Sequence, residues 1–373
     1  MKKVIIEGRH LSNNTGISHY FMPLLIRLVK NNRNLNFLIV TQDNHSLDDF
    51  NSFDNVEILI LKTPFWIKLN YLINLYYSII SLPIFLSKNN ADLLVSPYYD
   101  FIIPRNFNKK TILTIHDLCY FKISELYKIH TRYLNYIFFR GSLEKCCGIF
   151  TVSKSSLKDL LGYIPKNKEI KTEIVYNCFT KPEKKIISKK YSIKNIFSIK
   201  GKKIIYTGGF ENRKNLGRLF SAFYKVINLN EDVFLVITGN LEKNKKFIKL
   251  IKSYKVEKNI LFTGVLDNQE MECLYQSDLI GSINISLCEG FGRNSYEAKI
   301  HGIPLLCSDI DINHEVVGDY PFYCNPYNEN EIYEGINKLI NNEIRYRNSN
   351  IESRFTIDYN YKKFIGMINY FIE

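Results

Sequence analysis

Residues 288–308 of the chain read CEGFGRNSYEAKIHGIPLLCS. Asn294, followed three residues later by Glu297, is typical of a helix start, where the amide caps the first turn and the glutamate reaches back to it. Gly302 is typical of a helix end, and the apolar residues after it indicate a strand. This order of loop, helix and strand is one repeat of a sheet that is covered by helices.

The same alternation extends over the whole chain and is interrupted once. Short apolar runs alternate with helical stretches up to EIVYN (173–177), and the pattern restarts at KIIYTGG (203–209). Such alternation predicts an α/β protein with parallel sheets and helices on both faces. A length of 373 residues favours two domains. We expect an N-terminal domain over residues 1–185, a linker over 186–203 and a C-terminal domain over 204–355.

Twelve strands are predicted, seven before the linker and five after it. They are VIIEG (4–8), FLIVTQ (37–42), VEILIL (56–61), DLLVSP (92–97), KTILTI (110–115), CCGIFTVS (146–153), EIVYN (173–177), KIIYTGG (203–209), VFLVITG (233–239), KNILFTG (258–264), LIGSINI (279–285) and IPLLCS (303–308). Open parallel sheets bind ligands at the carboxyl ends of their strands. Two such domains that face each other would form a cleft lined by loops from both. The G-x-G-x-x-G fingerprint of dinucleotide-binding proteins is missing.

The charge of the chain limits the classes of partner. A formal net charge of +13 and a pI near 9.1 indicate an acidic partner, such as nucleic acid, an anionic membrane surface or a phosphorylated small molecule. No nucleic-acid-binding motif accompanies the lysine clusters at 184–203 and 243–255, so nucleic acid is disfavoured. Eight scattered cysteines without a C-x-x-C pattern indicate neither a zinc site nor a disulfide framework.

The helix start in the quoted stretch is also a candidate anion site. The backbone N–H groups of Gly292, Arg293 and Asn294 would point outward there, and the helix dipole favours negative charge at that end. Glycines at 290 and 292 let a ligand approach the backbone closely. With a diphosphate at this place, Glu297 could hold a neighbouring hydroxyl-rich group and Glu289 the group beyond the diphosphate. The alternative is that Glu297 is a capping residue and nothing more.

The pattern E-G-F-G-x-x-x-x-E, followed by A-x-x-x-G-x-P, resembles the retaining nucleotide-sugar glycosyltransferases of family 4. This resemblance implies the GT-B fold, in which two Rossmann-like domains face each other across a cleft and a C-terminal helix, here 356–373, packs back on the N-terminal domain. The second glutamate, Glu297, would hold the nucleotide ribose. The first, Glu289, would contact sugar hydroxyls, and the amides after Phe291 would meet the sugar and the diphosphate.

Three further segments match the same family. YTGGFENRKNLGRLFSAF (206–223) resembles the loop whose basic side chains neutralise the donor diphosphate. Members commonly have an arginine where Gly209 stands here, so that either Arg213 would substitute or one phosphate contact would be missing. KTILTIHDLCYF (110–121) contains the matching histidine, with Asp117 expected to orient the loop, and RHLSNNTGISHYFMPLL (9–25) contains the matching glycine. The resemblance assigns catalytic roles to His116, Glu289, Lys214 and Arg213. It assigns donor binding to Gly16, Gly209, Gly290, Phe291, Gly292, Arg293, Asn294 and Glu297.

Position 293 departs from the family pattern, which commonly has an apolar residue there. Arg293 could contact an acidic sugar or an acceptor phosphate, or it could lie on the domain surface. No D-x-D metal motif stands at a suitable strand end, so that Lys214, Arg213 and helix amides would act in place of a divalent ion. We therefore expect no cofactor and no metal.

The resemblance implies a retaining, metal-independent hexosyltransferase that uses a nucleotide-sugar donor and a glycan or lipid-linked acceptor. Bacterial surface polysaccharide synthesis, of lipopolysaccharide or capsule, is the implied setting. One alternative is a non-catalytic sugar-nucleotide-binding partner of another transferase, which would be expected to lose Glu289, His116 or Lys214. Another is a sugar-nucleotide 2-epimerase of the same fold, which should carry acid and base residues in place of the E-G-F-G block.

An apolar and aromatic segment at 64–87 is relevant to where in the cell the protein is located. Lys68 and Lys88 flank its aromatic side chains, so that it is either a buried helix or a segment lying in a membrane interface. No run of eighteen apolar residues predicts a membrane-spanning helix. We expect a cytoplasmic protein with peripheral attachment to the inner face of the cytoplasmic membrane, to which its positive charge would contribute.

Overall fold

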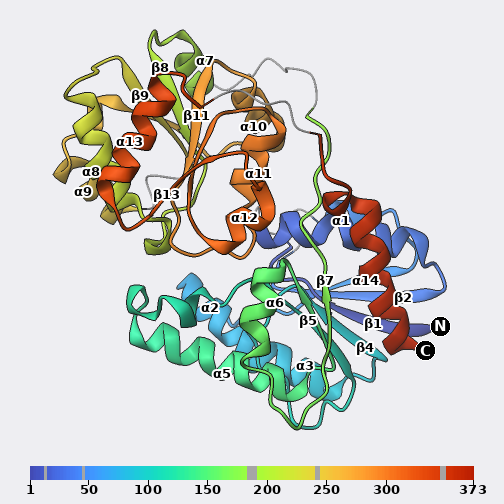
Figure 1. Ribbon diagram of the computed structural model, residues 1–373. Coiled ribbons are helices and arrows are strands. Elements are labelled where there is room, and N and C mark those ends of the chain that lie inside the picture. Colours follow the sequence, from blue (N-terminus) through green and yellow to red (C-terminus); the bar gives the residue numbers. More distant parts are fainter. Residues whose placement is uncertain (12–14, 44–46, 183–190, 240–243, 345–349) are drawn as a thin grey trace. The chain divides into compact units, whose positions relative to one another are not determined.

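The computed structural model describes residues 1–373 except for 12–14, 44–46, 183–190, 240–243 and 345–349. The chain divides into two compact units (Figure 1). The first unit consists of Met1–Phe179 and Glu352–Glu373, and the second consists of Thr180–Ile351.

The first unit is built on a seven-stranded sheet in the order β3-β2-β1-β4-β5-β6-β7. Its strands are β1 (Lys2–Glu7), β2 (Leu35–Thr41), β3 (Val56–Ile60), β4 (Leu93–Ser96), β5 (Lys110–Ile115), β6 (Gly148–Thr151) and β7 (Lys171–Ile174). Neighbouring strands pair in parallel. Each of the seven apolar runs predicted before the linker overlaps one of these strands, and the prediction of a parallel sheet is confirmed.

Helices cover both faces of this sheet. They are α1 (Gly16–Asn31), α2 (Asn70–Tyr76), α3 (Leu82–Lys88), α4 (Cys119–Lys122), α5 (Ile129–Lys145), α6 (Lys154–Leu161) and α14 (Ile357–Ile372), with a π-helical turn, Tyr77–Ser81, between α2 and α3. Pro83 lacks an N–H group and its ring would clash with a carbonyl one turn earlier, which accounts for the wider turn before it. On one face, α3 and α5 bury Leu86 and Phe139 in a common apolar cluster with the strands.

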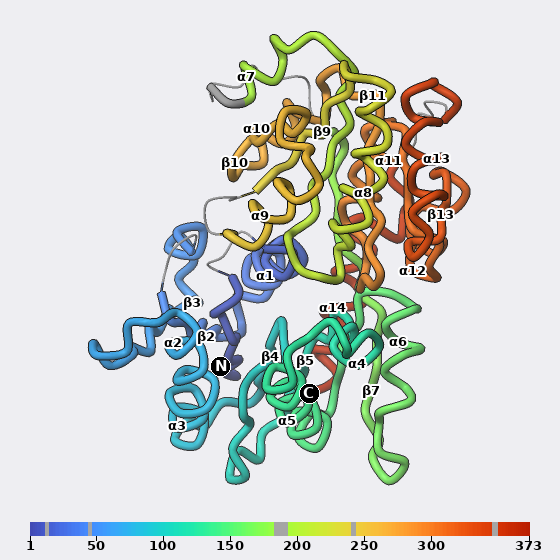
Figure 2. The backbone as a smooth tube through the Cα atoms, turned by 90° about the vertical axis from the view of Figure 1, so that its left-hand side faces the viewer, coloured from blue at the N-terminus to red at the C-terminus, as the bar shows by residue number. Residues whose placement is uncertain are grey.

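Helices α1 and α14 pack on the opposite face of the same sheet. The ring of Phe364 in α14 stacks on Phe150 of β6, with centroids 4.9 Å apart, and meets Phe21 of α1 edge-on at 5.6 Å. Residues 357–372 thus lie beside the N-terminal segment, and the N and C labels fall close together in both Figure 1 and Figure 2. A side chain at Gly148 would collide with Phe371 and Met367, so glycine lets α14 lie close to the sheet.

The second unit repeats the plan with six strands in the order β10-β9-β8-β11-β12-β13. They are β8 (Lys202–Tyr206), β9 (Val233–Thr238), β10 (Ile260–Gly264), β11 (Leu279–Asn284), β12 (Leu305–Ser308) and β13 (Phe322–Cys324), and neighbours pair in parallel. Five of these strands were predicted. The sixth, β13, was missed because a three-residue strand carries too short an apolar run to show a pattern.

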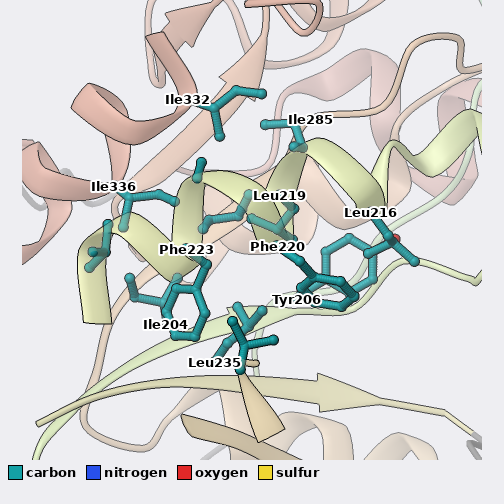
Figure 3. Packing of buried hydrophobic residues seen from close by; sticks show 14 of the residues in the cluster. Ile204, Tyr206, Leu216, Leu219, Phe220, Phe223, Leu235, Ile285, Ile332 and Ile336 are labelled. Atoms are coloured by element: carbon teal, nitrogen blue, oxygen red, sulfur yellow. The ribbon is translucent and has the colours of Figure 1, made fainter. Parts of the chain in front are cut away.

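The helices of the second unit are α7 (Tyr191–Ser198), α8 (Leu216–Ile227), α9 (Lys245–Ser253), α10 (Asn268–Tyr275), α11 (Arg293–Ile300), α12 (Asp311–Val317) and α13 (Glu329–Ile340). Figure 3 shows α8 inside one core, where Phe220 and Phe223 approach Ile204 and Leu235 of the strands and Ile336 of α13 closes the cluster. Burial of each such side chain contributes about 2 kcal/mol.

The predicted linker over 186–203 differs from the structure. Its residues up to 190 lie outside the described part of the chain. Residues 191–198 form α7, whose Ile193 and Ile196 are buried, and α7 packs beside β10. This stretch has a helical period of apolar residues that the surrounding lysines obscured.

The strand order of each sheet reverses at one point, between β1 and β4 in the first unit and between β8 and β11 in the second. In open parallel sheets, the crevice outside the carboxyl ends of these two strands is the usual ligand site. The loops that leave β1, β4, β8 and β11 are therefore the first places to look for function.

Candidate active site

The loops that leave β8 and β11 bring together three of the predicted catalytic side chains. Lys214 Nζ lies 2.5 Å from Oε1 of Glu289, and Arg213 Nη1 lies 3.0 Å from Oε2. Arg213 Nη1 also donates to the carbonyl oxygen of Cys288, at 3.0 Å. Each carboxylate oxygen therefore has its own cation, at the switch point of the second sheet.

Asn215 holds the loop that carries both cations. It has a left-handed backbone (φ 62°), which asparagine tolerates, and links the 3₁₀ turn Asn212–Lys214 to α8. Its side-chain amide donates to the carbonyl oxygens of Ile285, at 3.2 Å, and of Pro326, at 2.6 Å. These two bonds tie the loop after β8 to the chain that leaves β11 and β13, and so fix the position of Lys214.

Glu289 is ionised at neutral pH although it is buried. Burial alone would raise the pKa of this carboxyl, because it removes water from the charged form. Lys214 and Arg213 outweigh the effect of burial and lower the pKa to about 2, and a hydrogen bond from Ser286 contributes. Two cations and one carboxylate leave a net charge of +1 in a largely water-free place, where an anionic ligand is favoured.

Helix α11 begins two residues earlier than predicted. Its N-cap is Gly292, and no side chain caps the first turn, so the prediction that Asn294 is the cap is wrong. Gly292 has a left-handed backbone (φ 78°), which costs glycine nothing and turns the chain sharply into the helix. A Cβ at this position would also lie 3.1 Å from Oδ1 of the buried Asn313.

The first turn of α11 offers backbone donors as expected of a helix start. Within the part of the chain that the structure describes, nothing accepts a hydrogen bond from the amides of Gly292 and Asn294. Asn284 at the end of β11 donates to Ser295 Oγ at 2.6 Å and holds this turn at the edge of the sheet. The donors therefore belong to the same sheet edge as the three charged side chains, which is where an anion would gain from both.

The end of α11 agrees with its prediction. Gly302 follows the last helical turn with φ 72°, and its amide donates to the carbonyl of Lys299 at 3.1 Å. The next amide, of Ile303, donates to Ala298 at 2.9 Å. Both bonds together form a Schellman motif, which satisfies the last carbonyls of the helix.

Glu297 does not reach back to the helix start. Its Oε1 accepts a hydrogen bond from Arg293 Nε at 2.7 Å, and its Oε2 accepts one from the hydroxyl of Tyr275 at 3.0 Å. Burial, followed by the charge of Glu297, raises the pKa of Tyr275 well above its usual value, so the hydroxyl remains a donor. The capping interpretation of Glu297 is wrong. Arg293 and Tyr275 are both partners of Glu297, and a role of this carboxylate in donor binding stays a prediction.

His116 lies just after β5 in the first unit. Its Nε2 is 2.9 Å from the carbonyl oxygen of Pro97 and therefore carries the ring proton, because a carbonyl can only accept. Tyr20 packs edge-on against the ring at 5.0 Å. Burial lowers the pKa of His116 to about 4, so the ring is neutral at pH 7. A neutral ring held in this way can orient a hydroxyl through Nδ1. Asp117 accepts a hydrogen bond from the amide of Cys119 at 3.0 Å, which suits the loop-ordering role expected of it.

The glycines of the predicted site have different surroundings. Gly16 is the first residue of α1 after the N-cap Thr15, and a Cβ there would meet nothing within 4 Å, so packing does not require glycine. Gly209 accepts a hydrogen bond from the buried Tyr206 hydroxyl at 2.7 Å. Gly290 and the buried Phe291 connect Glu289 to the helix start. Roles in donor binding for these residues stay predictions.

A polar cluster at the switch point of the first unit was not predicted. Arg9, after β1, pairs with Asp100, after β4, and His10 Nε2 lies 3.2 Å from both oxygens of Asp100. The Arg9 amide donates to the fully buried Glu7 at 3.0 Å. Burial would raise the pKa of Asp100, but Arg9 and His10 lower it well below its usual range. The signal was available, because both loops directly follow predicted strands.

Two kinds of feature are missing from the described ranges. They contain no group of three or more His, Cys, Asp or Glu side chains that could hold a metal ion. None of the helices described in the structure has the length and apolar character needed to cross a bilayer.

Comparison with known families identifies the second unit. Residues 188–355 match the glycosyl transferases group 1. This stretch is a group 1 glycosyltransferase domain. The group 1 domain contains Arg213, Lys214, Glu289 and Glu297, so the charged cluster described above lies within it.

Two curated relatives of this chain are mannosyltransferases. The O-antigen chain mannosyltransferase RfbU of Salmonella typhimurium is 23% identical over 292 residues, which cover 77% of this chain and 76% of RfbU. The serotype-specific mannosyltransferase WbdA of Escherichia coli is 26% identical over 267 residues, which cover 68% of this chain and 32% of WbdA. The match thus spans about a third of the length of WbdA.

Solved structures share the fold of this chain over nearly all of its length. HepE of Anabaena, solved in complex with UDP-glucose, has a TM-score of 0.74 at 14% identity and covers 99% of this chain and 100% of its own. Sucrose-phosphate synthase from Thermosynechococcus elongatus has the same TM-score and identity and covers 99% of both chains. The prediction of two Rossmann-like domains of the GT-B class is confirmed.

Proposed function

We propose that the chain is a hexosyltransferase that takes a sugar from a nucleotide-sugar donor and passes it to a glycan or lipid-linked acceptor. The observation that carries this proposal is the cluster of Lys214, Arg213 and Glu289 at the switch point of the group 1 domain. It combines cations for a diphosphate with a carboxylate for sugar hydroxyls. The backbone donors at the start of α11 add to the attraction for phosphate.

The proposed reaction breaks the bond between C1 of the sugar and the phosphate oxygen of the nucleoside diphosphate. The hydroxyl oxygen of the acceptor forms the new bond to C1 on the same face, so the configuration at C1 is retained. The hydroxyl proton passes to an oxygen of the departing phosphate. Lys214 and Arg213 stabilise the negative charge that grows on this leaving group, which is the main contribution to rate that we assign to the protein.

The names of the relatives support the donor class. RfbU and WbdA are mannosyltransferases, and HepE was solved with UDP-glucose, so hexoses on a nucleoside diphosphate are the first donors to test. The named context of O-antigen synthesis supports a role in bacterial surface polysaccharide assembly. We place the reaction in the cytoplasm, at the inner face of the cytoplasmic membrane.

The decisive experiment incubates the full chain with a panel of nucleotide sugars and measures release of the nucleoside diphosphate, with and without acceptor extracts. Turnover of one hexose donor, with an unchanged anomeric configuration in the product by NMR, supports the proposal. Turnover that survives a chelator supports the metal-independent mechanism. Failure to bind any sugar nucleotide in calorimetry would contradict the proposal as a whole.

Lys214→Ala tests the role of the cation in the step itself. Because Lys214 would stabilise charge that develops on the leaving group, kcat should fall by roughly 100-fold or more, while the Kd of the donor rises far less. The matched control is Lys249→Ala, which removes an exposed lysine of α9 in the same unit. Equal, small losses of kcat and donor affinity would show that Lys214 does not act in the transfer step.

A further inference from the structure

Exposed large apolar side chains are concentrated on two segments of the first unit. Of 24 such side chains in the described ranges, eight lie within residues 65–84 and four within 129–137. Half of them (8 + 4 of 24) therefore fall on 29 residues (20 + 9). Isolated exposed apolar residues need no explanation, but a concentration of this kind marks an interaction surface.

Helix α5 carries large apolar side chains both in the core and at the surface. Phe138, Phe139 and Leu143 belong to the core of the first unit. Other large side chains at helical spacing stay exposed: Ile129 (80%), Tyr133 (68%), Tyr136 (50%) and Ile137 (41%). A helix with an apolar outer side as well as an apolar inner side is suited to a second apolar environment.

The segment 65–84 has the same character. Its outer side chains include Phe65 (87% exposed), Trp66 (68%) and Tyr71 (59%), followed by Ile84 (50%) in α3. Its inner side chains enter the same apolar cluster as the inner side of α5. The segment and α5 therefore cover one face of the sheet, and α2, α3 and α5 lie in the same part of the first unit in both Figure 1 and Figure 2. We call the outer side chains of 65–84 and 129–137 the aromatic surface.

The charges beside the aromatic surface are mainly positive, with Glu125 and Glu144 at the borders of its second segment. Residues 61–91 contain Lys62, Lys68 and Lys88 and no acidic residue. Residues 126–143 contain Lys128, Arg132 and Arg140 and no acidic residue. Aromatic and aliphatic side chains with cations beside them are the composition that lies at the interface of an anionic membrane, where rings enter the headgroup region and cations meet lipid phosphates.

We propose that the aromatic surface docks the protein on an anionic lipid bilayer, with α5 and the 65–84 segment both in contact with the headgroup region. A second copy of this chain is a poorer occupant, because two identical surfaces would bring six lysine or arginine charges (3 + 3) against another six. The proposal deepens the proposed function, since a lipid-linked acceptor lies in such a surface. It is tested by binding alone, so its failure would leave the transferase activity untouched.

The single tryptophan of the chain makes a direct test possible. Trp66 is exposed and lies in the aromatic surface, so its fluorescence reports on this surface alone. We expect a blue shift of its emission and co-sedimentation of the full chain with vesicles of phosphatidylglycerol and phosphatidylcholine. Vesicles of phosphatidylcholine alone should bind far less, and binding to the anionic vesicles should weaken as salt is raised.

Matched variants distinguish vesicle binding by the aromatic surface from nonspecific binding by other exposed side chains. Tyr133→Ser with Tyr136→Ser should abolish most of the binding, whereas Leu229→Ser with Tyr327→Ser, at exposed positions of the second unit, should not. Lys128→Gln with Arg132→Gln should lower vesicle affinity by roughly 30-fold, since each charge near an anionic surface contributes about fivefold. Lys249→Gln with Lys252→Gln removes as much charge from α9 and should have a small effect.

Four results would overturn the proposal. The first is the absence of a Trp66 shift and of co-sedimentation in the unmodified protein. The second is equal binding to neutral and anionic vesicles, and the third is equal loss in the surface and control variants. Concentration-dependent dimerisation that disappears in Tyr133→Ser with Tyr136→Ser would also overturn it and would assign the surface to a second copy of the chain.

Discussion

Lys214 and Arg213 already have an anionic partner before any donor is present. Glu289 bonds both cations, so a donor diphosphate would compete with this carboxylate for the same N–H groups. Under the proposed function, this competition would limit how tightly the site holds the product, a nucleoside diphosphate, and would favour its release. Glu289 would thereby serve both as a contact for sugar hydroxyls and as a limit on phosphate affinity.

Glu289→Gln should separate these two effects. The amide removes the negative charge but keeps an oxygen, so both cations become available to phosphate. We expect the affinity for the nucleoside diphosphate to rise about tenfold while turnover falls strongly. Calorimetry with the product, alongside a transfer assay, measures both quantities. Glu257→Gln, at an exposed position of the same unit, is the control, and an unchanged product affinity in the Glu289 variant would refute the competition.

The lowered pKa of Glu289 also predicts a dependence of stability on pH. A carboxyl whose folded pKa is about 2, against an ordinary 4.5, stabilises the fold fully above pH 4.5 and loses this contribution as the pH falls toward 2. The contribution is on the order of 3 kcal/mol. Hydrogen exchange of β8 and β11 amides between pH 6 and pH 3 measures it. Protection in Glu289→Gln should change less over this range, and parallel pH curves for the two proteins would contradict the assignment.

At the scale of single residues, the sequence predicted a pair of neighbouring side chains where both residues lie in motifs that match the family. Lys214 and Glu289 were both predicted, and the structure brings them together. The pairing of Glu297 with Tyr275 could not be predicted, because Tyr275 belongs to another helix and carries no motif. The pair of Arg293 and Glu297 is one helical turn apart, so its ion pair is predictable once the helix start is known.

Among elements, the largest revision concerns where α11 begins. Asn294 and Glu297 have the spacing of a capping box, but Gly292 starts the helix two residues earlier through its left-handed backbone. Backbone dihedrals are not visible in a residue pattern, so the pattern favours the cap with the better side chain. No helix was predicted over 129–145, because apolar residues around much of α5 hide the helical period.

Gly292→Ala should weaken this helix start. An alanine at φ 78° costs roughly 1–2 kcal/mol, and its Cβ would crowd Asn313. Unfolding measured by hydrogen exchange of α11 should show this loss, and donor affinity should fall with it. Gly16→Ala is the matched control at the start of α1, where a Cβ meets no other atom and stability should not change. A similar stability loss in both variants would argue against strain at position 292.

For the whole molecule, the sequence predicted the class and the number of domains because alternation of strands and helices is a repeated signal. The alternation does not determine the order of the strands in each sheet, and it is the order β10-β9-β8-β11-β12-β13 that places Lys214 and Glu289 after neighbouring central strands. The sequence pattern also did not determine where the linker begins and ends. Lysine-rich composition suggested a connection, whereas Ile193 and Ile196 anchor α7 within the second unit.

Helix α14 completes the first unit, and Phe364 is its central contact. Phe364→Ala removes a buried ring that packs between Phe21 and Phe150, which should destabilise the first unit by about 3–5 kcal/mol. Hydrogen exchange of β5 and β6 should report this loss, while amides of β8 and β11 in the second unit keep their protection. Lys362→Ala, at an exposed position of the same helix, should change little. Equal loss of protection in both sheets would mean that the units unfold together.

The place of α14 has a consequence for biosynthesis. The ribosome makes residues 1–179 first, yet Phe21 and Phe150 can contact Phe364 only after all of 180–351 has been translated. Domains usually fold in the order in which they are synthesised, from the N-terminus onward. Here the second unit can complete its folding before the first unit, which still lacks residues 352–373. Nascent chains should engage chaperones through these uncovered rings, and messages truncated before codon 352 should yield protein that is degraded even though residues 180–351 are intact.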